Sequence, residues 1–373
     1  MYGLSEGKLM ATYYVGKGGN DASDGTTWAK RKLTLNGAED IPVAAGDTVY
    51  VGPGTYRETL TCDVSGSSGS PITYIGDYDG SHTDGTGGIV RVTASDNDQT
   101  TARNYIVNMT GRAYRTFDGF AFDACPTSIY SIFWIATSDV DHLTIRNCTF
   151  NGWGGIGIKG FQSANLTNML VENCIATNCY NFYIDGEVQD NSGNVIQNCL
   201  FFANSGAVID TKSGGFTIKN CSFYGAYRCV YVSSSLNAGQ TVTVNNCVMA
   251  GINSFALAAA ATLGNLVEDY NLCPSRSNVA TGAHSLAYGS LLDMRWAHEL
   301  LNGGSMLSPF DLASYSQLIN VAGTSPTTAD MRGTSKKGTE REWGALEYDS
   351  TLDIEAGSGG AVSIQPIQGS VRL

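Results

Sequence analysis

The charged side chains best placed for chemistry follow a recurring Asn-Cys pair at a constant distance. Lys159, Asp185 and Asp210 each lie 12 residues after the Asn of such a pair, and further charged residues lie close by. The full candidate set is Lys159, Asp185, Glu187, Asp210, Lys212 and Arg228. If equivalent positions stack, the carboxylates would repel each other, so one would have a raised pKa or the group would bind a cation such as Ca²⁺.

Two chemistries suit this patch. Paired acids could act as general acid and general base on a glycosidic bond. A lyase would instead use Lys or Arg as the base, and Lys212 or Arg228 could serve. The competing interpretation is a solvated outer face whose opposite charges pair and add little stability. The sequence alone favours this last interpretation. No catalytic motif matches these positions, so no catalytic role is assigned to them by similarity.

Aromatic residues crowd the same segments. The candidates for contacts with sugar rings are Trp153, Tyr183, Tyr227 and Tyr231. The alternative is stacking inside the core, which suits Phe better than Tyr, because a Tyr hydroxyl needs water or a polar partner.

These side chains need a repeating scaffold, and the chain has a repeat between Leu143 and Met249. An Asn-Cys pair follows a short apolar run five times, with steps of 26, 25, 22 and 26 residues. The pairs are Asn147-Cys148, Asn173-Cys174, Asn198-Cys199, Asn220-Cys221 and Asn246-Cys247. Gly119 takes the equivalent place one coil earlier. A β-rich period in the twenties is typical of a solenoid.

The apolar residues before each Asn alternate, which indicates a strand with one buried face. The alternation breaks at the Asn, so we expect a bend with the Asn in the left-handed conformation. Successive coils of a solenoid stack about 4.8 Å apart. The five Asn would therefore form a hydrogen-bonded ladder, and the five Cys would form a column of buried, reduced thiols.

The Asn-Cys-x-Phe coils resemble the right-handed parallel β-helix of the pectate-lyase-like superfamily. The runs YYVGKGGNDASDGTTWA and AGDTVYVGPGTYRE are similar to the entry into such helices, and EDYNL and WGALEY to the exit. The resemblance spans roughly residues 12–348 and implies an all-β, single-stranded right-handed parallel β-helix. Its functional implication is broad, because the superfamily includes lyases, hydrolases, epimerases, phage tailspikes and non-catalytic fibres.

The composition of the chain limits the binding partners, metals and cofactors that we expect. The chain has 45 Gly, 15% charged residues and a net charge of −12, which argues against nucleic acid. No apolar run reaches the roughly 20 residues of a membrane helix. The ten Cys lack zinc-type spacing, so we predict no metal held by sulfur, no required disulfide, and no cofactor beyond a Ca²⁺ at the carboxylate patch. The first residues do not resemble a secretory leader, so we expect release by another route such as lysis.

Four segments are expected. Residues 1–45 form a leader and cap, with a short amphipathic helix over 28–38, and residues 46–290 form the β-helix. Residues 291–348 are expected to form a flanking helix, over 291–302, followed by a closing segment. Residues 349–373 are expected to form a Gly/Ser-rich tail that either pairs with another subunit or is loosely tethered.

Three functions are compatible with these features of the sequence. The first is a bacteriophage virion surface protein, of tailspike, fibre or decoration type, that is homotrimeric, contacts other virion proteins and binds a glycan or host surface. The alternative is a polysaccharide lyase or glycoside hydrolase acting on the outer wall of the β-helix. A cell-surface adhesin is third, because no export signal was found. The expected location is the virion or the extracellular space.

Overall fold

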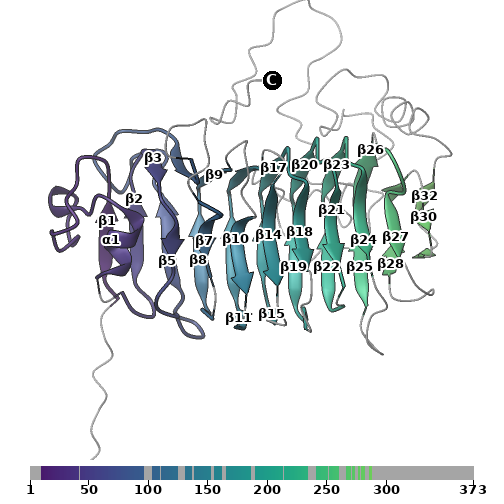
Figure 1. The fold of residues 1–373 in the computed structure, drawn as a ribbon, viewed down its shortest axis with the longest axis horizontal. Helices are drawn as coiled ribbons and strands as arrows, with labels where there is room; N and C mark the ends of the chain where they lie inside the picture. The colour runs from purple at the N-terminus through teal and green to yellow at the C-terminus, as the bar shows by residue number, and fades with distance from the viewer. Residues whose placement is uncertain are drawn as a thin grey trace, which may run out of the picture.

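A computed structural model describes residues 10–41, 43–95, 103–109, 111–124, 131–136, 138–152, 155–161, 165–185, 190–212, 214–233, 241–250, 252–259, 266–269, 271–273, 276–277, 279–281 and 285–287. Parallel strands stack into three long sheets that run along the molecule (Figure 1). In the regular coils the chain adds one strand to sheet A, one to sheet B and one to sheet C, and then returns to sheet A. This is the parallel β-helix that the repeat predicts.

Sheet A contains 11 strands: β1 (Thr12–Val15), β2 (Thr48–Val51), β5 (Ile72–Gly76), β8 (Arg115–Asp118), β12 (Leu143–Arg146), β16 (Leu170–Glu172), β19 (Asn194–Gln197), β22 (Phe216–Lys219), β25 (Val242–Asn245), β28 (Leu266–Asp269) and β31 (Ala280–Thr281).

Sheet B contains ten: β3 (Gly54–Arg57), β6 (Val90–Thr93), β9 (Ala121–Asp123), β13 (Thr149–Asn151), β17 (Ile175–Thr177), β20 (Leu200–Phe202), β23 (Ser222–Tyr224), β26 (Val248–Ala250), β29 (Leu272–Cys273) and β32 (Leu286–Ala287).

Sheet C contains nine: β4 (Leu60–Thr61), β7 (Tyr105–Asn108), β10 (Ser131–Ala136), β14 (Ile156–Phe161), β18 (Asn181–Asp185), β21 (Ala207–Thr211), β24 (Arg228–Val232), β27 (Leu257–Ala259) and β30 (Arg276–Ser277). A separate pair joins β11 (Val140–Asp141) to β15 (Leu166–Thr167).

The corner between sheets A and B is turned by a residue in the left-handed region. Its φ angles lie between 52° and 78° in six successive coils. The residues are Gly119, Asn147, Asn173, Asn198, Asn220 and Asn246. Asn tolerates this conformation better than other residues with a side chain, and Gly adopts it freely. The predicted bend, and its start at Gly119, are confirmed.

The Asn side chains at this corner form the predicted ladder, and all of the described bonds point one way. Three amide nitrogens donate to the Asn Oδ1 of the preceding coil: Asn173 to Asn147 at 3.4 Å, Asn198 to Asn173 at 3.4 Å and Asn220 to Asn198 at 3.3 Å. The first amide, of Asn147, donates to Asp118 Oδ1 at 2.8 Å. Because a carboxylate can only accept hydrogen bonds, the ladder ends at Asp118.

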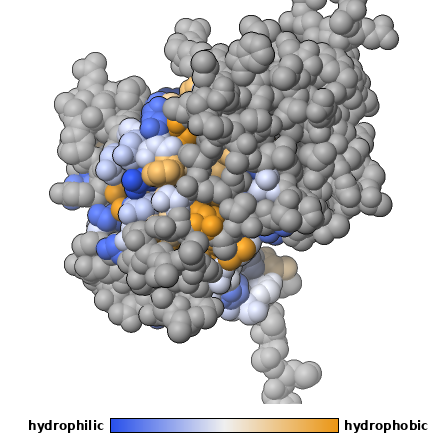
Figure 2. Space-filling view, turned by 90° about the vertical axis from the view of Figure 1, so that its right-hand side faces the viewer, coloured by the Kyte–Doolittle hydropathy of each residue, from blue (hydrophilic) through white to orange (hydrophobic). Residues whose placement is uncertain are grey.

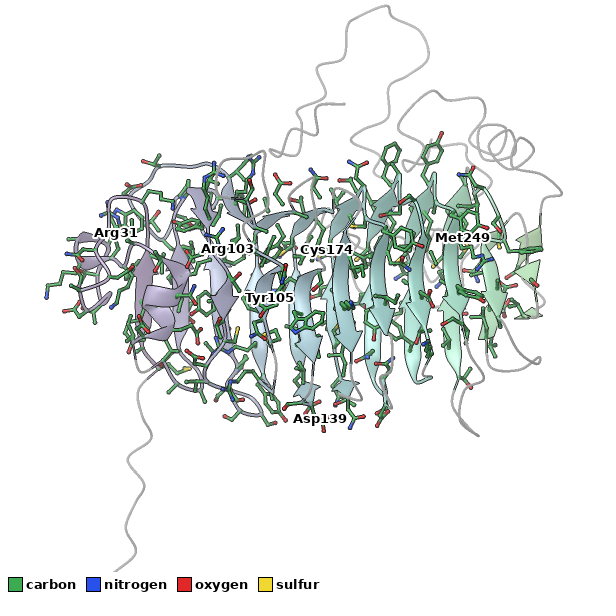
Figure 3. All side chains as sticks on the ribbon, viewed as in Figure 1. Arg31, Arg103, Tyr105, Asp139, Cys174 and Met249 are labelled. Carbon is green, nitrogen blue, oxygen red and sulfur yellow. The ribbon has the colours of Figure 1, made fainter. Side chains whose placement is uncertain are left out.

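The five Cys that follow these Asn residues are buried in a column, as predicted. Each thiol donates to the carbonyl two residues earlier at 3.1–3.3 Å. The nine described cysteines are all buried and unbridged, and burial raises the pKa of the Cys174 thiol well above its usual value. Cys174 lies between the sheets in the interior (Figure 3).

The N-terminal cap differs from the predicted single helix over 28–38. A 3₁₀ turn, η1 (Trp28–Lys30), and a short helix, α1 (Leu35–Glu39), take its place, and β1 before them is already part of sheet A. Buried Glu39 at the end of α1 accepts two hydrogen bonds from the Arg115 guanidinium, at 2.6 and 2.9 Å. The Tyr74 hydroxyl also donates to Glu39. These contacts attach the cap to the first coils.

At the other end the inner column of sheet A ends on a charged residue. The inner column of sheet A is apolar from Phe117 to Val244 and then reaches Glu268, which is fully buried and accepts from Asn271 and Ser285 at 2.7 and 2.5 Å. Figure 2 faces this end and shows apolar residues, in orange, among the described residues. The predicted segments 291–348 and 349–373 lie outside the described residues. No helix in the described ranges has the length and apolar character needed to cross a bilayer.

Candidate functional site

The outer face of sheet C carries one column of side chains that differ in chemistry from coil to coil. Strand pairing places five residues next to one another in this central column: Trp134, Lys159, Ile184, Asp210 and Tyr231. All five are half-buried. Because adjacent strands lie about 4.8 Å apart, the column extends over roughly 19 Å.

The central column corrects the predicted stacking of Asp185 on Asp210. Ile184, and not Asp185, pairs with Asp210, while Asp185 lies beside Gly160. The cause is the corner between sheets B and C, which comprises residues 152–155 and 203–206 in two coils but only 178–180 and 225–227 in the coils between and after them. A difference of one residue moves a side chain to the opposite face of a strand.

Asp210 is the carboxylate at the centre of this surface. Its Oδ1 is buried and accepts no hydrogen bond from the described residues. Burial raises the pKa of Asp210, while a hydrogen bond from Ser233 and the charges of Lys212 and Arg228 lower it by less. An acid with a raised pKa stays protonated to higher pH, as a proton donor in catalysis requires.

Arg228 begins the next strand, where it pairs with Ala207, and its charge acts on Asp210. Its guanidinium carbon is 4.3 Å from the centre of the Tyr231 ring and 5.2 Å from that of Tyr227. Tyr227 is 45% exposed, so one aromatic face is open to solvent at the edge of the site. Lys212, just after β21, is also exposed. The structure thus brings together Asp210, Lys212, Arg228, Tyr227 and Tyr231, five of the candidate residues.

The opposite end of the central column is aromatic and cationic. Trp134 stacks on Tyr105 with ring centres 5.8 Å apart, and the Lys159 ammonium lies 5.1 Å from the Trp134 ring. Figure 3 labels Tyr105, which comes from β7. Burial lowers the pKa of Lys159. Tyr105, Trp134 and Ile184 were not among the site residues predicted from the sequence. Each of them alternates with buried residues of its own strand, and this pattern could have indicated an outward-facing position.

Tyr183 is not available for contact with a sugar. It is fully buried, and it pairs with Ile158 and Ile209 on the inner face of sheet C. Its hydroxyl donates to Asn191 Oδ1 at 3.0 Å, so the polar atom is satisfied inside the core. The prediction was wrong because it assumed that a Tyr hydroxyl would be satisfied outside.

The structure does not describe the side chains of three candidate residues. Glu187 and Trp153 are not among the described residues, and for Asp185 only the backbone is described. Within the ranges given above, no three His, Cys, Asp or Glu side chains are grouped so that they could hold a metal ion. The Ca²⁺ expectation concerned Asp185, Glu187 and Asp210, and because the side chains of the first two are not described, it stays a prediction.

Residues 105–269 match the sequence family described as right handed beta helix region. This stretch includes the whole central column and the Asn ladder. It is a right-handed parallel β-helix, as the resemblance to the pectate-lyase-like superfamily predicted. None of the curated proteins matches the chain.

Several solved structures are similar at low identity. The chain is 18% identical to pectate lyase Pel9A, with 92% of this chain and 97% of that chain covered and a TM-score of 0.47. A rhamnogalacturonan lyase is 16% identical, with 89% and 96% covered and a TM-score of 0.45. The GH136 lacto-N-biosidase from Eubacterium ramulus is 9% identical, with 74% and 68% covered and a TM-score of 0.43.

Proposed function

We propose that this right-handed β-helix binds a linear polysaccharide along the central column and cleaves it with Asp210 as the proton donor. The surface has the features that a sugar chain needs. The Tyr231 ring offers an aromatic surface for stacking, and the charged groups of Lys159 and Asp210 offer hydrogen bonds. One sugar of an extended chain is about as long as one rung, roughly 4.8 Å, so successive sugars would meet successive coils.

The observation that carries the proposal is the place of Asp210, which stands in the central column on the outer face of sheet C with an Oδ1 that is buried and accepts no hydrogen bond from the described residues. A general acid has to be protonated near the working pH and must lie within reach of the leaving oxygen. Burial raises the pKa of this carboxyl, and its position on the outer face lets a bound chain approach it. Cleavage of a glycosidic bond, by hydrolysis or by elimination, benefits from a proton delivered to the departing oxygen.

The neighbours of Asp210 have distinct roles in this proposal. The Arg228 guanidinium, held over Tyr231, donates hydrogen bonds to the glycan and fixes its register. Tyr231 supports one sugar ring by stacking, and Tyr227 adds a second face at the edge.

The test compares the wild-type chain with Asp210→Asn on a panel of neutral and acidic polysaccharides. We expect wild type to shorten at least one polymer, measured by size-exclusion chromatography, and Asp210→Asn to retain binding but lose cleavage by at least about a hundredfold. The matched control is Asp24→Asn, because Asp24 is exposed on the distant N-terminal cap. Full cleavage by Asp210→Asn would remove this residue from the mechanism.

Binding without cleavage by wild type would favour the other prediction from the sequence, a virion surface protein that contacts a glycan. That role stays a prediction, with its homotrimer and its neighbouring virion proteins. Labelling of intact particles with an antibody against this chain, viewed by electron microscopy, tests it directly.

A further inference from the structure

The outer face of sheet B carries no charged side chain from β13 to β26. In each of these strands the middle residue is buried in the core, so the residues on either side of it point outward. The outward residues are Thr149, Asn151, Ile175, Thr177, Leu200, Phe202, Ser222, Tyr224, Val248 and Ala250. Over the same coils the outer face of sheet A carries Arg146, Glu172 and Lys219. A parallel sheet whose two faces both lack charge is typically covered on both sides.

The burial of this face increases towards the C-terminal end of the β-helix. Thr149 is exposed, Leu200 is half-buried, and Val248 is only 4% exposed. Val267 is the matched comparison, because it points outward from sheet A in the next coil and is 36% exposed. The end of sheet B is therefore covered, whereas the neighbouring part of sheet A is open to solvent at Val267.

The segment that follows β32 is the nearest source of this cover. Both helices of the described ranges, η1 and α1, belong to the cap at the opposite end of the molecule (Figure 1). The last described strand, β32, belongs to sheet B and pairs with β29. The chain therefore leaves the β-helix at the end of the covered face, and residues 288–373 follow there.

We infer that residues 291–302 cover the outer face of sheet B as an amphipathic helix. Their sequence, LLDMRWAHELLN, places Leu292, Trp296 and Leu300 four residues apart, which puts them on one side of a helix. The polar residues group together on the other side, and they are Arg295, His298, Glu299 and Asn302. Such a helix buries its apolar side on the uncharged face and keeps its charges in water.

The dimensions of the helix and of the face agree. A helix over residues 291–302 is about 18 Å long, and the five strands from β20 to β32 extend over about 19 Å. The link from Ala287 to Leu291 reaches at most about 14 Å, or about three rungs, so the helix has to start near the end of sheet B. It therefore runs back over Val248 towards Leu200. None of these residues belongs to the central column, so the inference does not depend on the proposed function.

The test places the photo-crosslinking residue p-benzoylphenylalanine at Leu200 of the full-length chain. Val195 is the matched control position, because it lies in the same coil, points outward from sheet A and is also half-buried. Chain labelled with heavy isotopes is mixed in, so that mass spectrometry separates links within one chain from links between copies.

We expect the probe at Leu200 to crosslink to residues 291–302 of its own chain and the probe at Val195 to form no such link. Links from Leu200 to another part of the chain or to the labelled copy would each overturn the inference, and so would the absence of any link from this position.

Trypsin gives a second measurement without the probe. Arg295 is the only site for this protease within residues 291–302, and a helix packed on sheet B protects it. Leu200→Asp puts a charge beneath the apolar side and should speed cleavage at Arg295 at least about tenfold, whereas Val195→Asp should leave the rate unchanged. Circular dichroism checks that both variants are folded. Equal acceleration by the two variants would contradict docking on sheet B, as would equal rates in Leu200→Asp and wild type.

Discussion

Asn198 does two things at once: it adopts a backbone conformation that most residues avoid, and its side chain forms hydrogen bonds to the coils on either side. At Asn198, φ is 54°, the amide donates to Asn173 at 3.4 Å, and its oxygen accepts from Asn220 at 3.3 Å. Gly could supply the backbone conformation and not the bonds, and Ala could supply neither. The two contributions can therefore be separated by substitution.

Asn198→Ala should lower the free energy of unfolding by about 2–3 kcal/mol, because it adds left-handed strain of about 1 kcal/mol and removes two amide contacts of about 1 kcal/mol or less each. Asn198→Gly should lose about 1 kcal/mol less. Urea denaturation followed by circular dichroism measures both. Equal losses in the two variants would show that the backbone conformation contributes nothing.

Asp210 should make stability depend on pH. Its pKa is higher in the folded chain than the ordinary value of 3.8, so ionisation costs more in the folded state than in the unfolded state. This cost is absent below the unfolded pKa and appears as the pH rises through the folded pKa, with each unit of difference worth about 1.4 kcal/mol.

We therefore expect Asp210→Asn to be more stable than wild type at about pH 7 and equal to it at about pH 3. Urea denaturation of the two proteins at both pH values is the measurement. A variant less stable than wild type at about pH 7 would mean that the charged carboxylate is stabilised by Lys212 and Arg228 more than burial penalises it.

At the scale of elements, the connections decide which side chains face outward. The corners between sheets B and C differ by a single residue, and this difference puts Ile184 and not Asp185 in the central column. The cap shows the same dependence on packing, since α1 has only five residues and is held by contacts to other coils. Its buried Glu39 pairs with Arg115, and both side chains are at most 1% exposed.

Removing one partner of this ion pair leaves a buried charge without compensation. Arg115→Leu should therefore destabilise the chain by about 3–5 kcal/mol. The double variant Arg115→Leu with Glu39→Leu should recover part of this loss, because neither charge then remains. Thermal unfolding of the single and double variants gives the coupling, and a double variant as unstable as the sum of the singles would mean that the pair does not act as a unit.

At the scale of the whole molecule, the candidate site exists only because coils stack. The central column takes one residue from each of five strands, β10 to β24, and no two of its members are closer than 21 residues in the sequence. Its geometry therefore depends on the hydrogen bonds between parallel strands, which set the rise from coil to coil, and on the buried inner residues of sheet C, such as Ile158, Tyr183 and Ile209.

The predicted homotrimer belongs to this scale. Mass measurement at micromolar concentration should give three times the 39.5 kDa of one chain. The reason is the proposed role at a virion surface, where several copies side by side bind a repetitive glycan more tightly than one copy does. A monomer in this measurement would count against the spike arrangement and would leave the glycan site unaffected.

The sequence by itself determined the period, the bends and the buried thiols. These follow from local rules that repeat at a nearly fixed spacing: Asn tolerates the left-handed conformation, and strand residues alternate between the two faces. Asn147, Gly119 and Cys174 could therefore be assigned without coordinates.

Only the tertiary structure decided which outward side chains become neighbours. The register between neighbouring coils depends on whether the corner between sheets B and C has three or four residues. Packing of the inner columns decides which residues of the following strand face the core. A spacing of 12 residues from the ladder Asn thus holds for Lys159 and Asp210 and becomes 11 for Ile184 and Tyr231. For the same reason Tyr183 faces the core, where Asn191, eight residues away, satisfies its hydroxyl.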